Sequence, residues 1–393
     1  MNPVYIVAAK RTPLGSFGGS LSSLSATELG AQSVKSTIES LDVGPLSVDE
    51  VLYGNVCQAN LGQAPARQIA IGAGISHNVP CTTINKVCSS GMKAVMFGAQ
   101  SIMLAQHDVV VCGGVESMSN VPFYLPHQRW GTKYGHQQTI DGLQKDGLTD
   151  AYNHQAMGNS GDLTAAKYGF SREEQDAYAV QSYHRAAKAT DDGAFQEEIA
   201  AVLVPQRKGD DIVVSKDEEY LKVNFDKIPK LRPAFSKEGT VTAANASTLN
   251  DGAATIILMS EKAVKEYDVT PLAQIMSFAD AAHEPEWFTT APSKAAPIAT
   301  KRAGFSMSDI DLYEVNEAFA VVPMAFAQSC ELDMSTINVH GGAVSLGHPL
   351  GCSGARIITT LVHALRHHNQ TNGLATLCNG GGGASAIVIK RLH

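Results

Sequence analysis

The chain has no surplus of basic residues, because 38 acidic side chains outnumber 30 lysines and arginines and leave a formal net charge of −8. A broad basic surface of the kind that holds nucleic acid is therefore absent. No run of apolar residues reaches the roughly 18 that a membrane span requires. We expect neither nucleic acid nor a membrane as a partner, and any anionic ligand must be held by a local site.

Paired cysteines are also lacking. The seven cysteines are odd in number and none forms a Cys-x-x-Cys pair, so neither a disulfide framework nor a zinc ribbon is indicated. The first residues hold only the short apolar run Val4 to Ala8, and the end Arg391-Leu392-His393 is not a peroxisomal SKL-type signal. We expect a cytoplasmic protein, with the mitochondrial matrix after loss of a transit peptide as the alternative.

What the chain does have is enough apolar sequence for a large core. Its 393 residues, 44 % of them apolar and 17 % charged, are typical of a globular enzyme of two or three domains. Segments rich in Val and Ile alternate with segments of helix length. This alternation predicts an α/β fold with mostly parallel sheets covered by helices.

Two distant stretches share one pattern. The first begins at Cys88-Ser89-Ser90-Gly91, continues with a helix-period apolar series and ends in a strand at Val109 to Cys112. The second begins at Cys352-Ser353-Gly354 and ends in a strand at Leu374 to Cys378. The pattern predicts a duplicated core. The more polar region from about 119 to 250 is either an insertion that presents a binding surface or a plain solvated excursion.

Cys88 directly precedes the first of these helices. Unpaired N–H groups and the positive end of the helix dipole favour a thiolate, so we expect a lowered pKa and a nucleophile. The alternative is a small buried hydrophobe, which is how most free cysteines behave.

A glycine-rich segment from Asn338 to Gly354 displays His348 between Gly347 and Pro349. Such a loop can approach a ligand closely, and His348 could act as a base towards a thiol or donate to an oxyanion. A structural histidine is the alternative for His348, and it is our interpretation of His340.

Two further positions could take part in chemistry. Cys378 ends a strand and is followed by Gly380 to Gly383, whose N–H groups could stabilise an enolate oxygen beside a second thiol. Asn316 lies where a strand turns into a helix and could position a water molecule. An N-cap explains Asn316 equally well.

These residues resemble a known family. The segments INKVCSSGMKA, VNEAFA, GGAVSLGHPLGCSGAR and CNGGGGASA are similar to the signature blocks of the thiolases, with similarity from Val4 to Lys390. Other segments, such as MSNVPFY and TVTAANASTLNDGAA, resemble the mitochondrial-type acetoacetyl-CoA thiolases more than the fatty-acid-degrading 3-ketoacyl-CoA thiolases.

The resemblance implies a thiolase fold of two βαβαβαβ halves stacked in five layers, αβαβα, with an inserted loop domain. It divides the chain into a first core half of residues 1–118 plus 250–270, a loop domain of residues 119–249 that binds CoA and assists oligomerisation, and a second core half of residues 271–393. It also implies a homotetramer built from dimers.

The implied activity interconverts two acetyl-CoA with acetoacetyl-CoA and CoA, without a required cofactor. In that scheme Cys88 carries the acetyl group, His348 activates it, and Asn316 holds a water in the oxyanion hole. Cys378 removes the α-proton of the second acetyl-CoA, and the N–H groups of Cys88 and Gly380 form the second oxyanion hole.

The resemblance also implies ligand contacts. Substrate and CoA would meet Tyr183, Lys222, Asn224, Lys227, Ser247, Met157 and Phe288. A potassium ion would be held by Tyr183, Ala243, Ala244, Ala246 and Val344. Two positions depart from the family: Ala156 replaces a His near the thioester, and Thr289 replaces a Pro after Phe288, so use of a 2-methyl substrate cannot be assumed.

Three alternatives remain open at this point. One is a 3-ketoacyl-CoA thiolase of broader short-chain specificity. A ketoacyl synthase-like enzyme shares the duplicated fold, but the second thiol, Cys378, argues against it. A non-catalytic acyl-CoA carrier is disfavoured because all four chemical residues are retained.

Overall fold

The computed structural model describes the whole chain, Met1–His393, and contains a ten-stranded sheet in two halves. The halves join where β1 pairs with β11 through two residue pairs, Tyr5 with Gln274 and Ile6 with Ala273. The first half contains β1 (Val4–Arg11), β3 (Glu50–Gly54), β4 (Cys81–Ile84), β5 (Val109–Ser117) and β10 (Asn250–Ser260), with the short β2 (Gly15–Ser16) beside β10. The second contains β11 (Ala273–Ala282), β12 (Leu312–Val315), β13 (Asn372–Asn379) and β14 (Gly383–Arg391).

Both halves repeat one strand order, which confirms the predicted duplication. The order β3-β5-β10-β1 of the first half corresponds to β12-β13-β14-β11 of the second half. The first half has β4 beside β3, and at the matching place beside β12 the second half has only a single parallel bridge between Tyr313 and Ile337. β3 runs parallel to β4 and β5, and β12 runs parallel to β13. However, β10 and β14 are antiparallel to both of their neighbours. Each half is thus less parallel than predicted, and the first half, with five main strands, has one strand beyond the four of βαβαβαβ.

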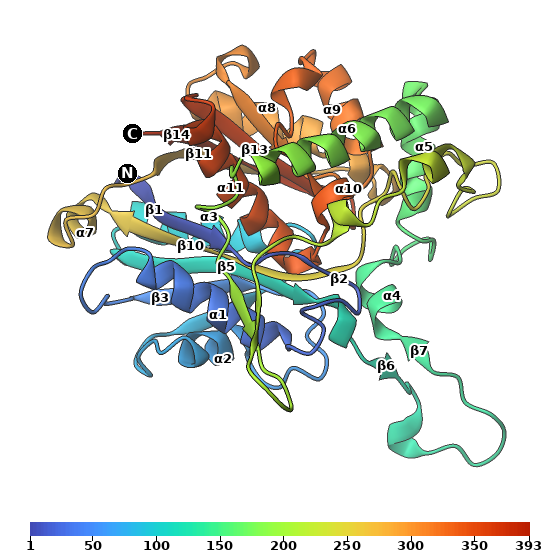
Figure 1. Cartoon of the computed structure of the whole chain (residues 1–393), viewed down its shortest axis with the longest axis horizontal. Helices are drawn as coiled ribbons and strands as arrows, with labels where there is room; N and C mark the ends of the chain where they lie inside the picture. The colour runs from blue at the N-terminus through green and yellow to red at the C-terminus, as the bar shows by residue number, and fades with distance from the viewer.

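Helices and sheets alternate in five layers (Figure 1). One outer layer contains α1 (Ala26–Glu39) and α2 (Pro65–Gly72). The central layer, between the two sheet halves, contains α3 (Ser90–Met103) and α11 (Leu350–His367). The other outer layer contains α8 (Pro292–Arg302) and α9 (Val321–Cys330). The predicted αβαβα arrangement is confirmed.

Strand β5 shows why the layers form. All nine of its residues are buried. Val109, Val111 and Val115 pack towards α1 and α2, whereas Val110 and Cys112 pack towards the central helices. Since side chains alternate between the faces of a strand, a strand covered on both faces needs an apolar residue at nearly every position.

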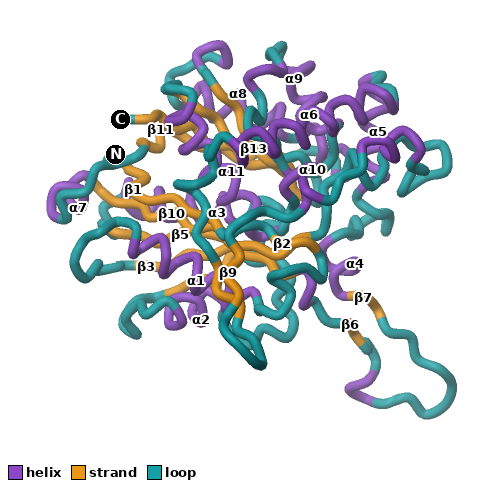
Figure 2. The backbone as a smooth tube through the Cα atoms, in the orientation of Figure 1, coloured by secondary structure: helices purple, strands orange, loops and turns teal.

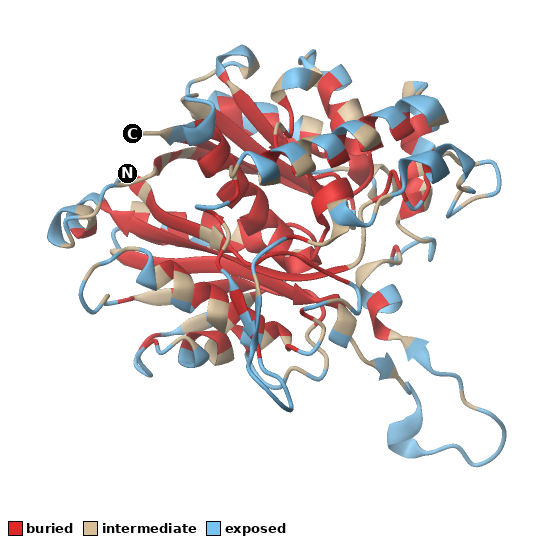
Figure 3. Cartoon of the chain, in the orientation of Figure 1, coloured by how far each residue is buried: buried red, intermediate tan, exposed pale blue.

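The segment between β5 and β10 leaves the core and returns to it. It contains β6 (Phe123–Tyr124), β7 (Ile140–Asp141), α4 (Gly142–Gly147), α5 (Gly158–Tyr168), α6 (Arg172–Asp191), β8 (Val202–Val204) and β9 (Ile212–Val214). Long loops dominate it in Figure 2, and the loop between β6 and β7 projects from the molecule with an almost fully exposed surface (Figure 3).

The remaining helices are short: α7 (Glu261–Glu266), α10 (Ala343–Leu346), and the 3-10 turns η1 (Met118–Asn120), η2 (Gln128–Trp130), η3 (Glu219–Leu221), η4 (Phe225–Lys230), η5 (Pro285–Thr290), η6 (Met307–Asp309) and η7 (Met334–Thr336). None of the helices combines the length and apolar character needed to cross a membrane.

Candidate active site

A tight turn presents Cys88 between the end of β4 and the start of α3. The Lys86 N–H donates to the Ser90 Oγ at 2.8 Å, and that hydroxyl donates to the Val87 carbonyl at 2.6 Å. Val87 has φ of 48°, a left-handed conformation that is unfavourable for a β-branched residue. The turn is therefore held by hydrogen bonds in a strained form that places Cys88 just before the helix, where the sequence predicted it.

The prediction of a lowered pKa for Cys88 is wrong. Burial raises the pKa of this thiol to about 11, against the opposite influence of the N–H groups of Gly380 and of Cys88 itself. A charged thiolate loses its hydration when it is only 8 % exposed, and two amide donors do not replace that loss. Cys88 is thus a neutral thiol at pH 7 and needs a base.

Cys378 is the next-to-last residue of β13, just before the turn of residues 380–382, and it lies close to Cys88. It is fully buried, and burial together with the charge of a Cys88 thiolate raises its pKa well above the ordinary value. The Ser89 hydroxyl donates to Asn379 Oδ1 at 3.0 Å and so ties the two turns together. A Cβ added to Gly380 would come within 3.3 Å of the Met157 side chain, and the Gly380 N–H lies close enough to the Cys88 thiol to favour its charged form against the effect of burial.

His348 is a neutral base with a free nitrogen. Its Nδ1 lies 2.6 Å from the Ser353 Oγ, and that hydroxyl donates to the Pro349 carbonyl at 2.9 Å. Because a hydroxyl has one proton, both bonds form only when Nδ1–H donates to Ser353. Nε2 is then unprotonated, and it has no partner within the protein. Burial, assisted by the charge of Arg356, lowers the pKa of His348 to about 3.

Glycines bring the starts of α3 and α11 into contact. A Cβ on Gly91 would lie 2.8 Å from the Gly351 carbonyl oxygen, and one on Gly354 would lie 2.3 Å from the Met92 nitrogen. Neither helix could approach so closely with a side chain at these positions. The loop of Cys88 and the loop of His348 each lead directly into one of these helices, so this contact brings the two loops to the same end of the central layer.

Asn316 follows β12 and reaches His348. Its Nδ2 lies 3.5 Å from the His348 Nδ1, while its buried Oδ1 has no partner. The N-cap of α9 is Ala320, four residues further on, so the alternative interpretation of Asn316 as an N-cap is wrong. An orphaned buried amide oxygen beside a neutral imidazole suits a bound water molecule.

A cavity of about 640 Å³ opens onto His348. Met157, Lys222 and Ser247 line it, as do Ala243 and Ala246 of the predicted cation site. Ala156 is also in the wall. Since a Cβ on Gly380 would touch Met157, the turn that follows Cys378 and contains Gly380 packs against the Met157 side of the cavity.

Other predicted contacts lie outside the cavity wall. Asn224 and Lys227 are exposed residues at the start of η4. Tyr183 instead packs against Val344 in a small buried cluster. Ala244 is buried next to the lining residues.

Phe288 does not line the cavity either. It is 2 % exposed and belongs to the apolar cluster under α8 and α9, against which Met157 also packs. The Oγ1 atoms of Thr289 and Thr164 lie 2.6 Å apart. Thr289, which stands where the family has a Pro, therefore makes a buried hydrogen bond with Thr164 of α5.

Two buried carboxylates near the site, Glu317 and Glu116, were not predicted from the sequence. Glu317, next to Asn316, accepts hydrogen bonds from the backbone N–H of Val344 at 2.9 Å and from Tyr178 at 2.7 Å. Glu116 accepts from the Gly351 N–H at 2.9 Å, and burial raises its pKa to about 7. Both fix the glycine-rich segment around His348. The sequence does contain a signal for them, because Glu116 and Glu317 are each an acidic residue inside an otherwise apolar segment.

Together, the fold and this geometry place two buried thiols, Cys88 and Cys378, and a neutral histidine, His348, on a duplicated α/β core. Comparison with known proteins agrees. Residues 4–262 match the thiolase N-terminal domain and residues 269–391 match the thiolase C-terminal domain. The chain belongs to the thiolase family.

Relatives match along almost the whole chain. A probable acetyl-CoA acetyltransferase of Dictyostelium discoideum is 54 % identical over 100 % of this chain and 95 % of its own length. A mitochondrial acetyl-CoA acetyltransferase of Rattus norvegicus is 52 % identical over 100 % of this chain and 92 % of its own. The crystal structure of the Acat5 thiolase of Ascaris suum in complex with coenzyme A has a TM-score of 0.94 and 46 % identity, covering 99 % of this chain and 100 % of that one.

Proposed function

We propose that this protein is an acetyl-CoA C-acetyltransferase that interconverts two acetyl-CoA with acetoacetyl-CoA and CoA through an acetyl-Cys88 intermediate. The observation that carries the proposal is the pair of neighbouring thiols, Cys88 on the turn before α3 and Cys378 at the end of β13, at the same end of the core as a neutral imidazole with a free Nε2. The names of the full-length relatives support the same activity.

In the first half-reaction, His348 Nε2 accepts the Cys88 proton as the sulfur attacks the thioester carbonyl of acetyl-CoA. The carbonyl oxygen becomes negative and is stabilised by His348 and by a water held on Asn316. When the tetrahedral intermediate collapses, CoA sulfur leaves and takes up the proton. Acetyl-Cys88 and free CoA remain.

In the second half-reaction, Cys378 starts as a buried neutral thiol, so its own proton leaves first, and we assign that proton to the free Nε2 of His348. The Cys378 thiolate then removes an α-proton from a second acetyl-CoA, and the enolate oxygen is stabilised by the N–H groups of Cys88 and Gly380. The enolate carbon attacks the acetyl carbonyl on Cys88, and the leaving Cys88 sulfur takes up the proton from His348. The product is acetoacetyl-CoA, and both cysteines are again neutral thiols.

CoA occupies the cavity in this proposal. Met157, Ser247 and Lys222 line it, and the positive charge of Lys222 is shared with Glu218, whose Oε2 is 3.6 Å from the Lys222 Nζ. We assign further contacts to Tyr183, Asn224 and Lys227, and a role in shaping the acyl pocket to Phe288, because the thiolase resemblance implies them. The proposed division is residues 1–118 with 250–270, a loop domain of 119–249, and 271–393.

The proposal includes a potassium ion near the loop domain. The Tyr183 hydroxyl has no hydrogen-bond partner, and no hydrogen bond reaches the carbonyl oxygens of Ala243 and Ala244. Neutral oxygen donors of this kind suit a hard monovalent cation, with Ala246 and Val344 completing the set. The ion would order the wall of the cavity. Replacing potassium by sodium in the assay tests this part.

We assign a homotetramer and a cytoplasmic location, with the mitochondrial matrix as the alternative. The projecting loop supports association, because Trp130 and Tyr134 are 90 % and 99 % exposed. Relatives include a cytosolic and a mitochondrial form. Light scattering on the purified chain and fractionation of cells test these two assignments.

One assay separates the candidate activities. The protein is mixed with acetoacetyl-CoA and CoA, and acetyl-CoA is measured as it forms. Formation of two acetyl-CoA per acetoacetyl-CoA supports the proposal. Higher kcat/KM for longer unbranched 3-ketoacyl-CoA would assign a 3-ketoacyl-CoA thiolase of broader specificity. Turnover only with a malonyl donor would assign a synthase, and binding without turnover would assign a carrier.

A further inference from the structure

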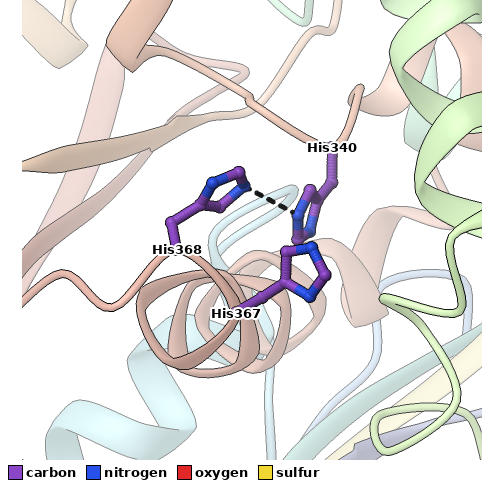
Figure 4. A group of neighbouring side chains, drawn as sticks. All are labelled: His340, His367 and His368. Atoms are coloured by element: carbon purple, nitrogen blue, oxygen red, sulfur yellow. Dashed lines mark hydrogen bonds between the residues drawn. The ribbon is translucent and has the colours of Figure 1, made fainter.

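Three histidines gather far from the cavity wall, at the other end of α11. His367 is the last residue of this helix, His368 is its C-cap, and His340 comes from the loop before α10. One ligand nitrogen from each ring lies within 4.8 Å of the other two (Figure 4). The His340 and His368 Nε2 atoms are 3.1 Å apart.

His340 is prepared to act as a neutral ligand. It is 3 % exposed, and its Nδ1 has no hydrogen-bond partner. Burial, with the neighbouring imidazoles, lowers its pKa to about 3, so the ring stays unprotonated at neutral pH. The His340 nitrogen that lies next to His368 is Nε2, so this nitrogen is placed to bind a cation held among the three rings.

The surroundings also favour a cation. The C-terminal end of a long helix carries partial negative charge. Asp192, at the C-cap of α6, has a pKa lowered by Lys188 and further by His367 and His340, so its negative charge is near the cluster. His363, one turn earlier, has its Nε2 occupied by the Ala9 carbonyl at 2.9 Å and is not available.

We propose that His340, His367 and His368 form a site for a divalent transition metal of the zinc class. Three imidazole nitrogens are ligands of choice for zinc, and they leave a fourth position for water. Zn–N bonds of about 2.0–2.1 Å place tetrahedral nitrogens roughly 3.4 Å apart. His367 and His368 are exposed, so their rings are free to rotate and close the wider spacings.

The bound metal would join two segments. His340 precedes the glycine-rich segment that leads to His348, and the other two ligands end the helix that begins next to His348. The metal therefore clamps both ends of one unit of the fold and raises its stability. This inference stands on the histidine geometry and does not depend on the proposed activity.

Cobalt binding provides the test, because cobalt reports ligand type through its visible spectrum. The full chain is dialysed against Co²⁺ and compared with the double variant His367→Gln/His368→Gln. His77→Gln, an exposed histidine elsewhere, is the matched control. We expect one high-affinity Co²⁺ per chain without sulfur-to-metal charge transfer in the parent and control. Affinity in the double variant should fall by at least about tenfold.

Two further readouts sharpen the result. Zinc should raise the Tm of the parent and of His77→Gln but not of the double variant, and metal-free thiolysis should be equal in all three. Equal cobalt affinity in the double variant and the control would overturn the proposal. So would a spectrum dominated by thiolate charge transfer, which would assign the metal to the cysteines, or an absence of binding to the parent.

Discussion

At the scale of single residues, Cys88 and His348 begin in their neutral forms. Burial holds the pKa of Cys88 at about 11 and that of His348 at about 3. Moving a proton from sulfur to nitrogen would create two buried charges, which is unfavourable before substrate arrives. Transfer coupled to attack avoids this cost, because the charge passes on to the substrate oxygen. The resting thiol is thereby protected from adventitious reaction.

Replacing Cys88 by Ser should abolish the acetyl intermediate. A hydroxyl is far less acidic than a thiol, and His348 is too weak a base to activate it. We expect thiolysis to fall by more than about a thousandfold. Intact-protein mass spectrometry after acetyl-CoA treatment checks the intermediate. Cys330→Ser, which lies away from the turn, is the control, and an adduct that persists in Cys88→Ser would remove Cys88 from this role.

Replacing Cys378 by Ala should leave acetylation of Cys88 intact but block condensation. In the proposed mechanism the first half-reaction uses His348, whereas proton removal from the second acetyl-CoA uses Cys378. Loss of a general base typically costs about 10²–10⁴-fold. The measurement is exchange of acetyl-CoA methyl protons with deuterated water. Exchange at the parent rate would show that another group is the base.

At the scale of elements, the site depends on how closely α3 and α11 approach. Glycines 91 and 354 allow the backbones to touch, and Glu116 bonds the N–H of Gly351 at the start of α11. Packing of this kind is sensitive to a single added methyl group.

Gly354→Ala should separate the two helices. The new Cβ would meet the Met92 nitrogen at 2.3 Å, and backbone cannot rotate away as a side chain can. We expect a loss of about 3 kcal/mol in the free energy of unfolding, measured in urea, and slower acetylation of Cys88. Gly44→Ala meets nothing within 4 Å and should change stability by less than about 0.5 kcal/mol. Equal stability of the two variants would show that the helices adjust without cost.

Part of the fold and of the site could be predicted from local sequence patterns. The duplicated core and the position of Cys88 before α3 follow from apolar periodicity and from the repeated Cys-Ser-Gly segments. The upward shift of the Cys88 pKa could not be predicted in this way. It depends on burial against α11, which lies more than 260 residues later in the chain. The antiparallel β10 and β14 were missed because buried strands look alike whatever their direction.

In the candidate site, too, contacts between residues far apart in the chain could be predicted only in part. Sequence motifs placed His348 and Asn316 in one centre, and the structure confirms that they are neighbours, with the Asn316 Nδ2 3.5 Å from the His348 Nδ1. The burial of Phe288 and the bond from Thr289 to Thr164 arise from packing between η5 and α5. No spacing rule links positions 164 and 289, so contacts of this type require the folded chain.

At the scale of the whole molecule, buried groups with opposite shifts set the stability against pH. Burial lowers the pKa of His340 and His348 to about 3, whereas burial raises that of Glu116 to about 7 and that of Glu314 to about 8. Unfolded histidines titrate near 6.5 and unfolded glutamates near 4.3. Counting these four groups, the unfolded chain binds two more protons than the folded chain between about pH 3 and 4.3, so they make stability rise with pH. Between about 4.3 and 6.5 the extra histidine protons of the unfolded chain are balanced by the glutamate protons of the folded chain.

The free energy of unfolding should therefore form a plateau between about pH 4.3 and 6.5 and fall on both sides. Above about 6.5 the folded chain still holds its glutamate protons, so stability is lost as pH rises through the pKa values of Glu116 and Glu314. Each group contributes about 1.4 kcal/mol per pH unit within its window. Urea unfolding across this range, with a chelator present, measures the profile. In His340→Gln the rise below about pH 4.3 should be half as steep and the plateau should slope downward with pH, whereas the exposed His136→Gln should match the parent. A parent stability that keeps increasing from pH 4.3 to 8 would contradict the protonation states assigned to these buried groups.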